Sequence, residues 1–129
     1  MIAAAATAEG VLLVDVENEV VLGPGSEVPE VERPGVELPR VVATAGAGAT
    51  VVAVVERRPP LLISRDGGTT WSEAGGGLPA GFDVAVAEDE PDRMLYAARN
   101  RLYLSRNGGV FWSSLPFELP DVVSVAWID

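Results

Sequence analysis

Short apolar runs separated by turn residues make up most of this 129-residue chain. Runs such as "VVAVV" (51–55) are apolar at every position instead of alternating, which is typical of strands covered on both faces. Turn-like links, "EDEPD", "RN" and "RNGG", join four runs near the C-terminus. These runs are Phe82–Ala87, Arg93–Ala98, Arg101–Ser105 and Val110–Leu115. No segment shows a capped helical stripe, so the pattern predicts an all-β protein of antiparallel strands.

The pattern repeats after 41 residues. The segment "SRDGGTTW" (Ser64–Trp71, the first box) returns as "SRNGGVFW" (Ser105–Trp112, the second box), and the flanking apolar runs align in phase. A weaker copy lies at Glu9–Leu22 and aligns without a gap on Arg99–Trp112, which places Asp15 at the serine position. Four antiparallel strands per repeat of about 40 residues are typical of a β-propeller blade.

A second marker supports the same phase. A Leu-Pro dipeptide followed by an apolar run occurs at Leu38, Leu78 and Leu119. Proline cannot donate to a strand ladder, so it suits the position just before a strand begins. Each marker therefore predicts the start of an innermost strand.

The repeat predicts one domain, 1–129, of three four-stranded blades. Its parts are blade one at 1–22 with the C-terminal strand 121–129, an acidic proline-rich loop at 23–39, blade two at 40–75 and blade three at 82–115. Natural propellers have about four blades or more, so we expect two copies to close a six-bladed ring. In this homodimer the C-terminal strand of each copy would complete the first blade of its partner.

The first box resembles the Asp-box, or bacterial neuraminidase repeat, with the pattern Ser-x-Asp-x-Gly-x-Thr-Trp. The matched positions are Ser64, Asp66, Gly68, Thr70 and Trp71, and the second box keeps Ser105, Gly109 and Trp112, with Asn107 for the aspartate and Phe111 for the threonine. The resemblance covers most of the chain as blades and only the two boxes as a motif. It implies a propeller like those of sialidases, sortilin-like receptors and photosystem assembly factors, in which the box fastens the rim away from the ligand.

The residue types of the box agree with a structural role. Asp66 can accept hydrogen bonds from backbone N–H groups one to three residues further on, and Asn107 offers the same acceptor. Gly67 and Gly68 permit positive φ. Trp71 and Trp112 would begin the outermost strands and pack between blades. A metal or sugar contact by Asp66 is the alternative.

Charge and composition exclude several function classes. Nineteen acids against nine arginines give a net charge of −10, which argues against binding to nucleic acid or to anionic membranes. Lysine, histidine and cysteine are absent, which removes the common general bases, nucleophiles and soft metal ligands. We therefore expect no cofactor and no metal. The apolar opening "MIAAAATAEG" is interpreted as a strand, and no run is long enough to enter a membrane, so we expect a cytoplasmic protein.

Enzymatic activity is not expected. The activity that the resemblance to sialidases implies would require converging arginines and a tyrosine nucleophile. The two tyrosines, Tyr96 and Tyr103, lie in apolar runs that suit a core. Paired carboxylates of the ordinary glycosidase type stay open. We predict a non-catalytic binding or scaffold module, and the alternative is a carbohydrate-active or carbohydrate-binding propeller fragment of the sialidase-like group.

One face of the predicted blades gathers arginines. Strand connectivity places Arg57, Arg58, Arg99 and Arg101 at the same end, opposite both boxes. The acidic loop joins this end and contains Glu27, Glu30, Glu32 and Glu37. Two interpretations stay open: these glutamates neutralise the arginines, or the arginines hold an anionic ligand or acidic peptide with the loop as a lid.

Overall fold

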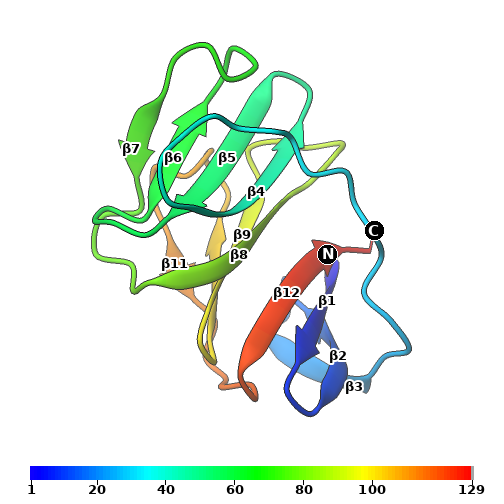
Figure 1. Cartoon of the computed structure of the whole chain (residues 1–129). Coiled ribbons are helices and arrows are strands. Elements are labelled where there is room, and N and C mark those ends of the chain that lie inside the picture. The colour runs from blue at the N-terminus through cyan, green and yellow to red at the C-terminus, as the bar shows by residue number, and fades with distance from the viewer. Residues whose placement is uncertain (129) are drawn as a thin grey trace.

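The computed structural model describes residues 1–128 and consists of twelve strands without a helix in that range. The strands are β1 (Ile2–Thr7), β2 (Gly10–Asp15), β3 (Val20–Pro24), β4 (Val41–Ala47), β5 (Thr50–Val55), β6 (Leu61–Ser64), β7 (Ser72–Ala74), β8 (Gly81–Val86), β9 (Met94–Ala98), β10 (Leu102–Ser105), β11 (Ser113–Ser114) and β12 (Val122–Trp127). They form three antiparallel four-stranded sheets (Figure 1). The predicted all-β class and the four-strand repeat are confirmed.

The sheets follow the repeat. Sheet one has the order β12-β1-β2-β3, sheet two β4-β5-β6-β7, and sheet three β8-β9-β10-β11. Each Leu-Pro marker precedes an innermost strand, namely β4, β8 or β12. The largest differences in the boundaries are at two places: β3 extends to Pro24 inside the expected loop, and β11 is confined to Ser113–Ser114. The bounds of β8, β9 and β10 differ from the expected runs by one residue.

Sheet one is assembled from both ends of the described chain. β12 pairs with β1 of the same chain, with Val125 opposite Ala5, and the N–H of Ile128 donates to the carbonyl of Ile2 at 2.9 Å. This differs from the expected strand exchange, because the link after sheet three is short and delivers β12 directly beside β1. Ring closure by a second copy stays a prediction.

The N-terminal copy is shifted by one residue from the alignment proposed above. In sheet three, Tyr103 lies on the face that packs against the preceding sheet in the arrangement, sheet two. In sheet one, Leu12 lies on the face that packs against its own preceding sheet, sheet three, so Leu12 is the equivalent of Tyr103. Counting from Leu12, Val14 and not Asp15 takes the position of the box serine. A shift of one residue moves a side chain to the other face of a sheet, and in this copy both faces are apolar, so the sequence does not reveal the register.

Two apolar interfaces order the sheets as two, three, one. The first interface joins sheets two and three, and its buried members are Ala45, Val52, Val54, Leu61, Ile63, Val84, Met94, Tyr96 and Ala98. The second joins sheets three and one around buried Leu95, Leu102, Leu104, Val14 and Val125, among others. Sheets one and two are therefore at opposite ends of the arrangement, although they are neighbours in sequence.

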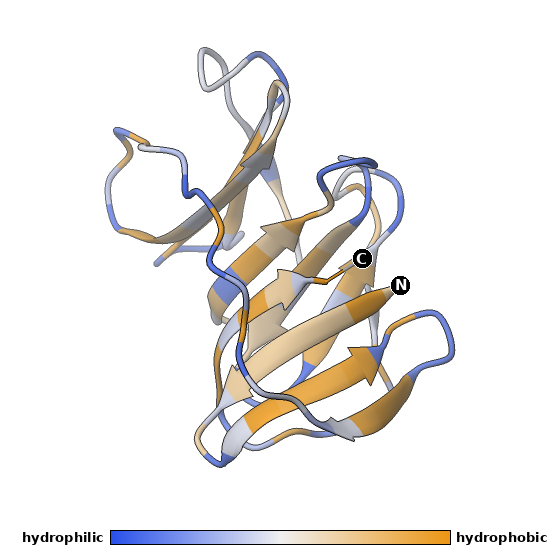
Figure 2. Cartoon of the chain, turned by 90° about the vertical axis from the view of Figure 1, so that its right-hand side faces the viewer, coloured by the Kyte–Doolittle hydropathy of each residue, from blue (hydrophilic) through white to orange (hydrophobic). Residues whose placement is uncertain are grey.

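Residues 25–39, here called the strap, connect these two ends. The strap leaves β3 and passes across the arrangement to β4, coloured cyan in Figure 1 and seen in front of the strands in Figure 2. Pro34, Val36 and Leu38 are half-buried, whereas the residues between them are exposed. This alternation indicates an extended segment with one side packed against the sheets and the other side exposed to solvent.

No helix in residues 1–128 is both long and apolar enough to cross a bilayer.

Candidate functional site

The first box closes a turn around the Asp66 carboxylate. The side chains of Ser64 and Thr70 donate to it at 2.7 and 2.6 Å, and the N–H groups of Thr69 and Thr70 donate at 3.1 and 2.8 Å. The Gly68 N–H donates to the Ser64 hydroxyl at 2.8 Å. Every polar atom of the carboxylate thus serves the turn, with donors three and four residues further on.

The second box repeats this turn with an amide. The Phe111 N–H donates to Asn107 Oδ1 at 3.0 Å, and the Gly109 N–H donates to the Ser105 hydroxyl at 2.8 Å. Trp112 packs against the interface between sheets two and three, and its indole N–H donates to the Gly109 carbonyl at 3.0 Å. Trp71 instead covers a small cluster on the side of sheet two that faces away from sheet three.

Sequence reasoning did not identify a clamp between the two boxes. Arg65 of the first box donates to the Gly108 carbonyl of the second box at 2.8 Å and pairs with Asp92 at 3.4 Å. The boxes therefore fasten neighbouring sheets to each other as well as closing their own turns.

The hydrogen bonds of the first box make its stability depend on pH. The Thr70 hydroxyl, followed by the Thr70 N–H and the Ser64 hydroxyl, holds the Asp66 pKa below its ordinary value of 3.8. A depressed pKa in the folded state means that the contribution is present above the ordinary value and is lost as pH falls through the folded-state pKa.

We expect Asp66→Asn to lower the melting temperature at pH 7, and we expect this deficit to shrink progressively as the pH falls below about 4 toward the folded-state pKa of Asp66. Asparagine still accepts the N–H bonds, as Asn107 does, but it lacks the charge. Thermal melts of both proteins from pH 7 to pH 2.5 measure the difference. A deficit that stays constant over this range would contradict a role of the charge.

The four arginines predicted to form a ligand face lie at the end of the sheets opposite the two boxes, and three of them form ion pairs with acidic residues of the same chain. Arg57 pairs with Glu73 at 3.4 Å, Arg99 with Asp121 at 3.3 Å and Arg101 with Glu118 at 3.1 Å. None of these acids belongs to the strap, so the first of the two interpretations, neutralisation by the strap glutamates, does not hold for these three arginines. Arg58 has no ion pair or hydrogen bond within residues 1–128. A hollow of about 290 Å³ is lined by Arg57 and Arg58 but not by Arg99 or Arg101.

The three innermost strands present matching apolar side chains at this same end. Four residues after the leucine of each Leu-Pro marker lie Val42, Phe82 and Val123, here called the apolar trio. Their exposed fractions are 39%, 50% and 65%. Together with Val36 of the strap they line a hollow of about 490 Å³, the mouth hollow. Val42 also lines the hollow of Arg57 and Arg58, so the two are contiguous. The position four residues after the marker is the sequence signal that would have found this site.

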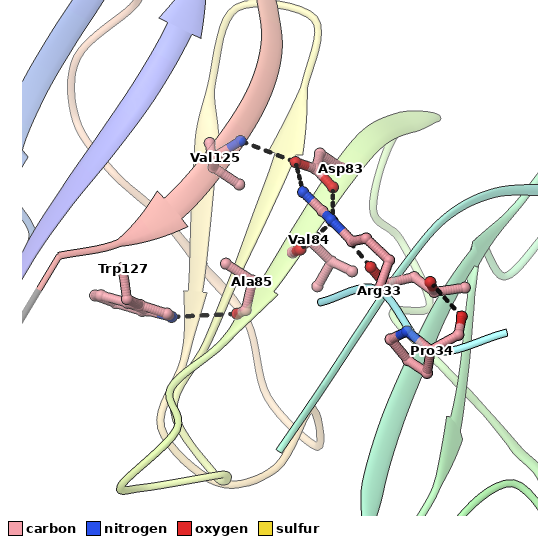
Figure 3. Close-up of polar contacts among 8 residues, drawn as sticks. Arg33, Pro34, Asp83, Val84, Ala85, Val125 and Trp127 are labelled. Atoms are coloured by element: carbon pink, nitrogen blue, oxygen red, sulfur yellow. Dashed lines mark hydrogen bonds and ion pairs between the residues drawn. The ribbon is translucent and has the colours of Figure 1, made fainter. Parts of the chain in front are cut away.

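The floor of the mouth hollow is an ion pair between a buried carboxylate and a partly exposed guanidinium. Arg33 of the strap binds Asp83 of β8 through two bonds, of 2.6 and 3.0 Å, and Asp83 is only 3% exposed (Figure 3). Arg33 also donates to the carbonyl of Thr44 on β4 at 2.8 Å, and Asp83 accepts the N–H of Val125 on β12 at 2.9 Å. One ion pair thus joins the strap to the innermost strands of all three sheets.

Two of the strap glutamates lie elsewhere than expected. Glu30 and Glu32 line a hollow of about 500 Å³ with Glu88 and Trp127, at the box end of the innermost strands. The Arg93 guanidinium stacks 4.8 Å from the Trp127 ring centroid, and the indole N–H donates to Ala85 (Figure 3). Within residues 1–128, no group of three or more acidic side chains has the spacing to hold a metal ion.

Comparison with known proteins supports the fold only. No family model and no curated protein matches the chain. A crystal structure of a GH74 enzyme of Niastella koreensis is similar, with a TM-score of 0.53 and 21% identity over 92% of this chain. The chain spans 18% of the length of that enzyme. This likeness agrees with a propeller-like arrangement of the three sheets.

Proposed function

We propose that this protein is a non-catalytic binding module whose ligand docks in the mouth hollow. The observation that carries the proposal is the apolar trio, because all three repeats expose an apolar side chain at the same position around one hollow. Scattered exposed apolar residues need no explanation, whereas apolar residues gathered in a hollow with a charged rim are typical of interaction sites.

The chemistry of the rim suggests a polypeptide ligand. An apolar ligand segment would cover the trio, and a carboxylate would bind Arg58, a rim arginine whose side chain has no partner of its own within residues 1–128. Bonds between guanidinium and carboxylate groups are directional and strong when water is excluded. The net charge of −10 repels strongly acidic partners, so the ligand combines apolar side chains with one or two carboxylates.

Peptide phage display against the folded chain tests this proposal. We expect enriched peptides that carry apolar residues beside Asp or Glu, and we expect their binding to weaken about tenfold in Phe82→Ser and in Arg58→Glu, the loss of about 1.4 kcal/mol. Val110→Ser is the matched control, since Val110 is 80% exposed but lies in the second box at the other end. Peptides that bind Phe82→Ser as tightly as the wild type would contradict the site.

The carbohydrate-active alternative is favoured by the likeness to a GH74 enzyme and by the hollow that contains Trp127, Glu30, Glu32 and Glu88. Aromatic rings and carboxylates are the groups that sugar-binding and glycosidase sites use. A thermal-shift screen with a polysaccharide panel separates the two functions. A sugar-dependent shift that is lost in Trp127→Ala and kept in Phe82→Ser would favour the alternative.

A further inference from the structure

The three sheets differ in how they protect their outer edge. β7 and β11, the outer strands of sheets two and three, have three and two residues and are mostly polar. β3, the outer strand of sheet one, has five residues, and its first three are Val20, Val21 and Leu22, with exposed fractions of 45%, 38% and 55%. Sheet one therefore lacks the protection that the other two sheets have.

An edge strand offers unpaired backbone groups, and proteins usually shield such edges by shortness, charge, proline or bulges. β3 has two partial shields: Pro24, which lacks an N–H, and a register shift against β2 between Leu13 and Val14. Neither places a charge on the strand. A free segment of about four residues thus stays open to a further strand.

We propose that β3 pairs with β3 of a second copy of this chain, antiparallel about a two-fold axis, to form a continuous eight-stranded sheet. With the axis at Val21, Val20 of each copy lies opposite Leu22 of the other, so apolar side chains meet along the whole contact. Such self-complementarity is the requirement for a two-fold interface.

The charges beside β3 favour this antiparallel partner. Glu17 and Glu19 precede the strand, and Gly23, Pro24 and Gly25 follow it. Antiparallel pairing brings the acids of one copy opposite the neutral residues of the other, whereas parallel pairing would place acids opposite acids and be destabilised. The two copies still carry a net charge of −10 each, so the dimer is weak at low salt and strengthens as salt screens the repulsion.

This contact is separate from the mouth hollow and from ring closure. The apolar trio lies on the innermost strands and β3 on the outermost strand of sheet one, so failure of either proposal leaves the other standing. Ring closure would join the free sides of sheets one and two and would not bring two β3 strands together.

The absence of cysteine from the chain allows a direct test by single-cysteine variants. Residues opposite each other in antiparallel strands have Cα atoms about 4.5–5.5 Å apart, within the range that a disulfide spans. We expect Val21→Cys to form a disulfide-linked dimer under mild oxidation at least tenfold faster than Val110→Cys, the control with a more exposed side chain off the edge. If the two-fold axis lies at Val20 or Leu22 instead of Val21, the cysteine variant at that position would cross-link fastest.

Sedimentation of the wild-type chain completes the test without any substitution. We expect a dimer whose share rises with protein concentration and with salt, and which is lost in Leu22→Lys. Equal cross-linking rates at all four cysteine positions, or a wild-type monomer at every concentration and salt, would overturn the proposal.

Discussion

Replacing Arg33 with alanine is expected to destabilise the fold by about 3 kcal/mol and to release the strap. Removal of one partner from a buried ion pair leaves an uncompensated charge, which costs about 3–5 kcal/mol, and the 35% exposure of the Arg33 side chain places this case at the low end. Urea denaturation measures the free energy of unfolding. A glutamate-specific protease measures the release, because Glu30, Glu32 and Glu37 lie in the strap.

Two further variants make the Arg33 result specific. Arg33→Lys keeps the charge but cannot make both bonds to Asp83, so we expect an intermediate loss. Arg58→Ala removes an arginine without a partner in residues 1–128 and should change neither unfolding nor proteolysis. If Arg33→Ala unfolds at the same urea concentration as Arg58→Ala, the ion pair does not hold the three sheets together.

Tyr96→Ala is expected to cost about 3–5 kcal/mol, the largest loss from any single substitution proposed here. The Tyr96 ring is fully buried between sheets two and three, with ring centroids 6.0 Å from Trp112 and 6.1 Å from Tyr103. A Cβ atom at Gly81 would overlap the same ring, so the ring also packs tightly against β8. Truncation therefore leaves a cavity at the centre of an interface.

Tyr96→Phe separates packing from hydrogen bonding. The Tyr96 hydroxyl donates to the Pro79 carbonyl at 2.7 Å, and loss of that bond should cost about 1 kcal/mol. Burial raises the pKa of Tyr96 well above its ordinary value, so the hydroxyl stays protonated as a donor. Equilibrium unfolding of Tyr96→Phe and Tyr96→Ala measures the loss in the free energy of unfolding for each variant. Equal losses would assign the whole effect to the hydrogen bond and none to packing of the ring.

Local patterns in the sequence were sufficient for the strands. The Leu-Pro markers precede the innermost strands, and the interior position expected of Tyr96 agrees with its burial. Each of these two features depends on a few neighbouring residues. The missing N–H of proline indicates where an innermost strand begins, and the apolar run around Tyr96 indicates burial. The class and the four-strand repeat could therefore be predicted before any long-range contact was known.

The remaining features depend on residues far apart in sequence. Arg33 and Asp83 are separated by 50 positions, and nothing near either residue indicates the other. The register of the N-terminal copy was missed because alanine and valine occupy both faces of β1 and β2, which removes the alternation that reveals a face. The route of the strap follows from the order of the sheets, which only the packing defines.

The position of β12 has a consequence for biosynthesis. During translation, β1, β2 and β3 emerge first, but their sheet stays without its innermost strand until residue 127 has left the ribosome. Sheets two and three are each built from one continuous segment and can form earlier, since closing a short loop costs less entropy than closing a long one. Through most of synthesis the alanine-rich β1 therefore presents an open ladder, the kind of segment that molecular chaperones shield in nascent chains.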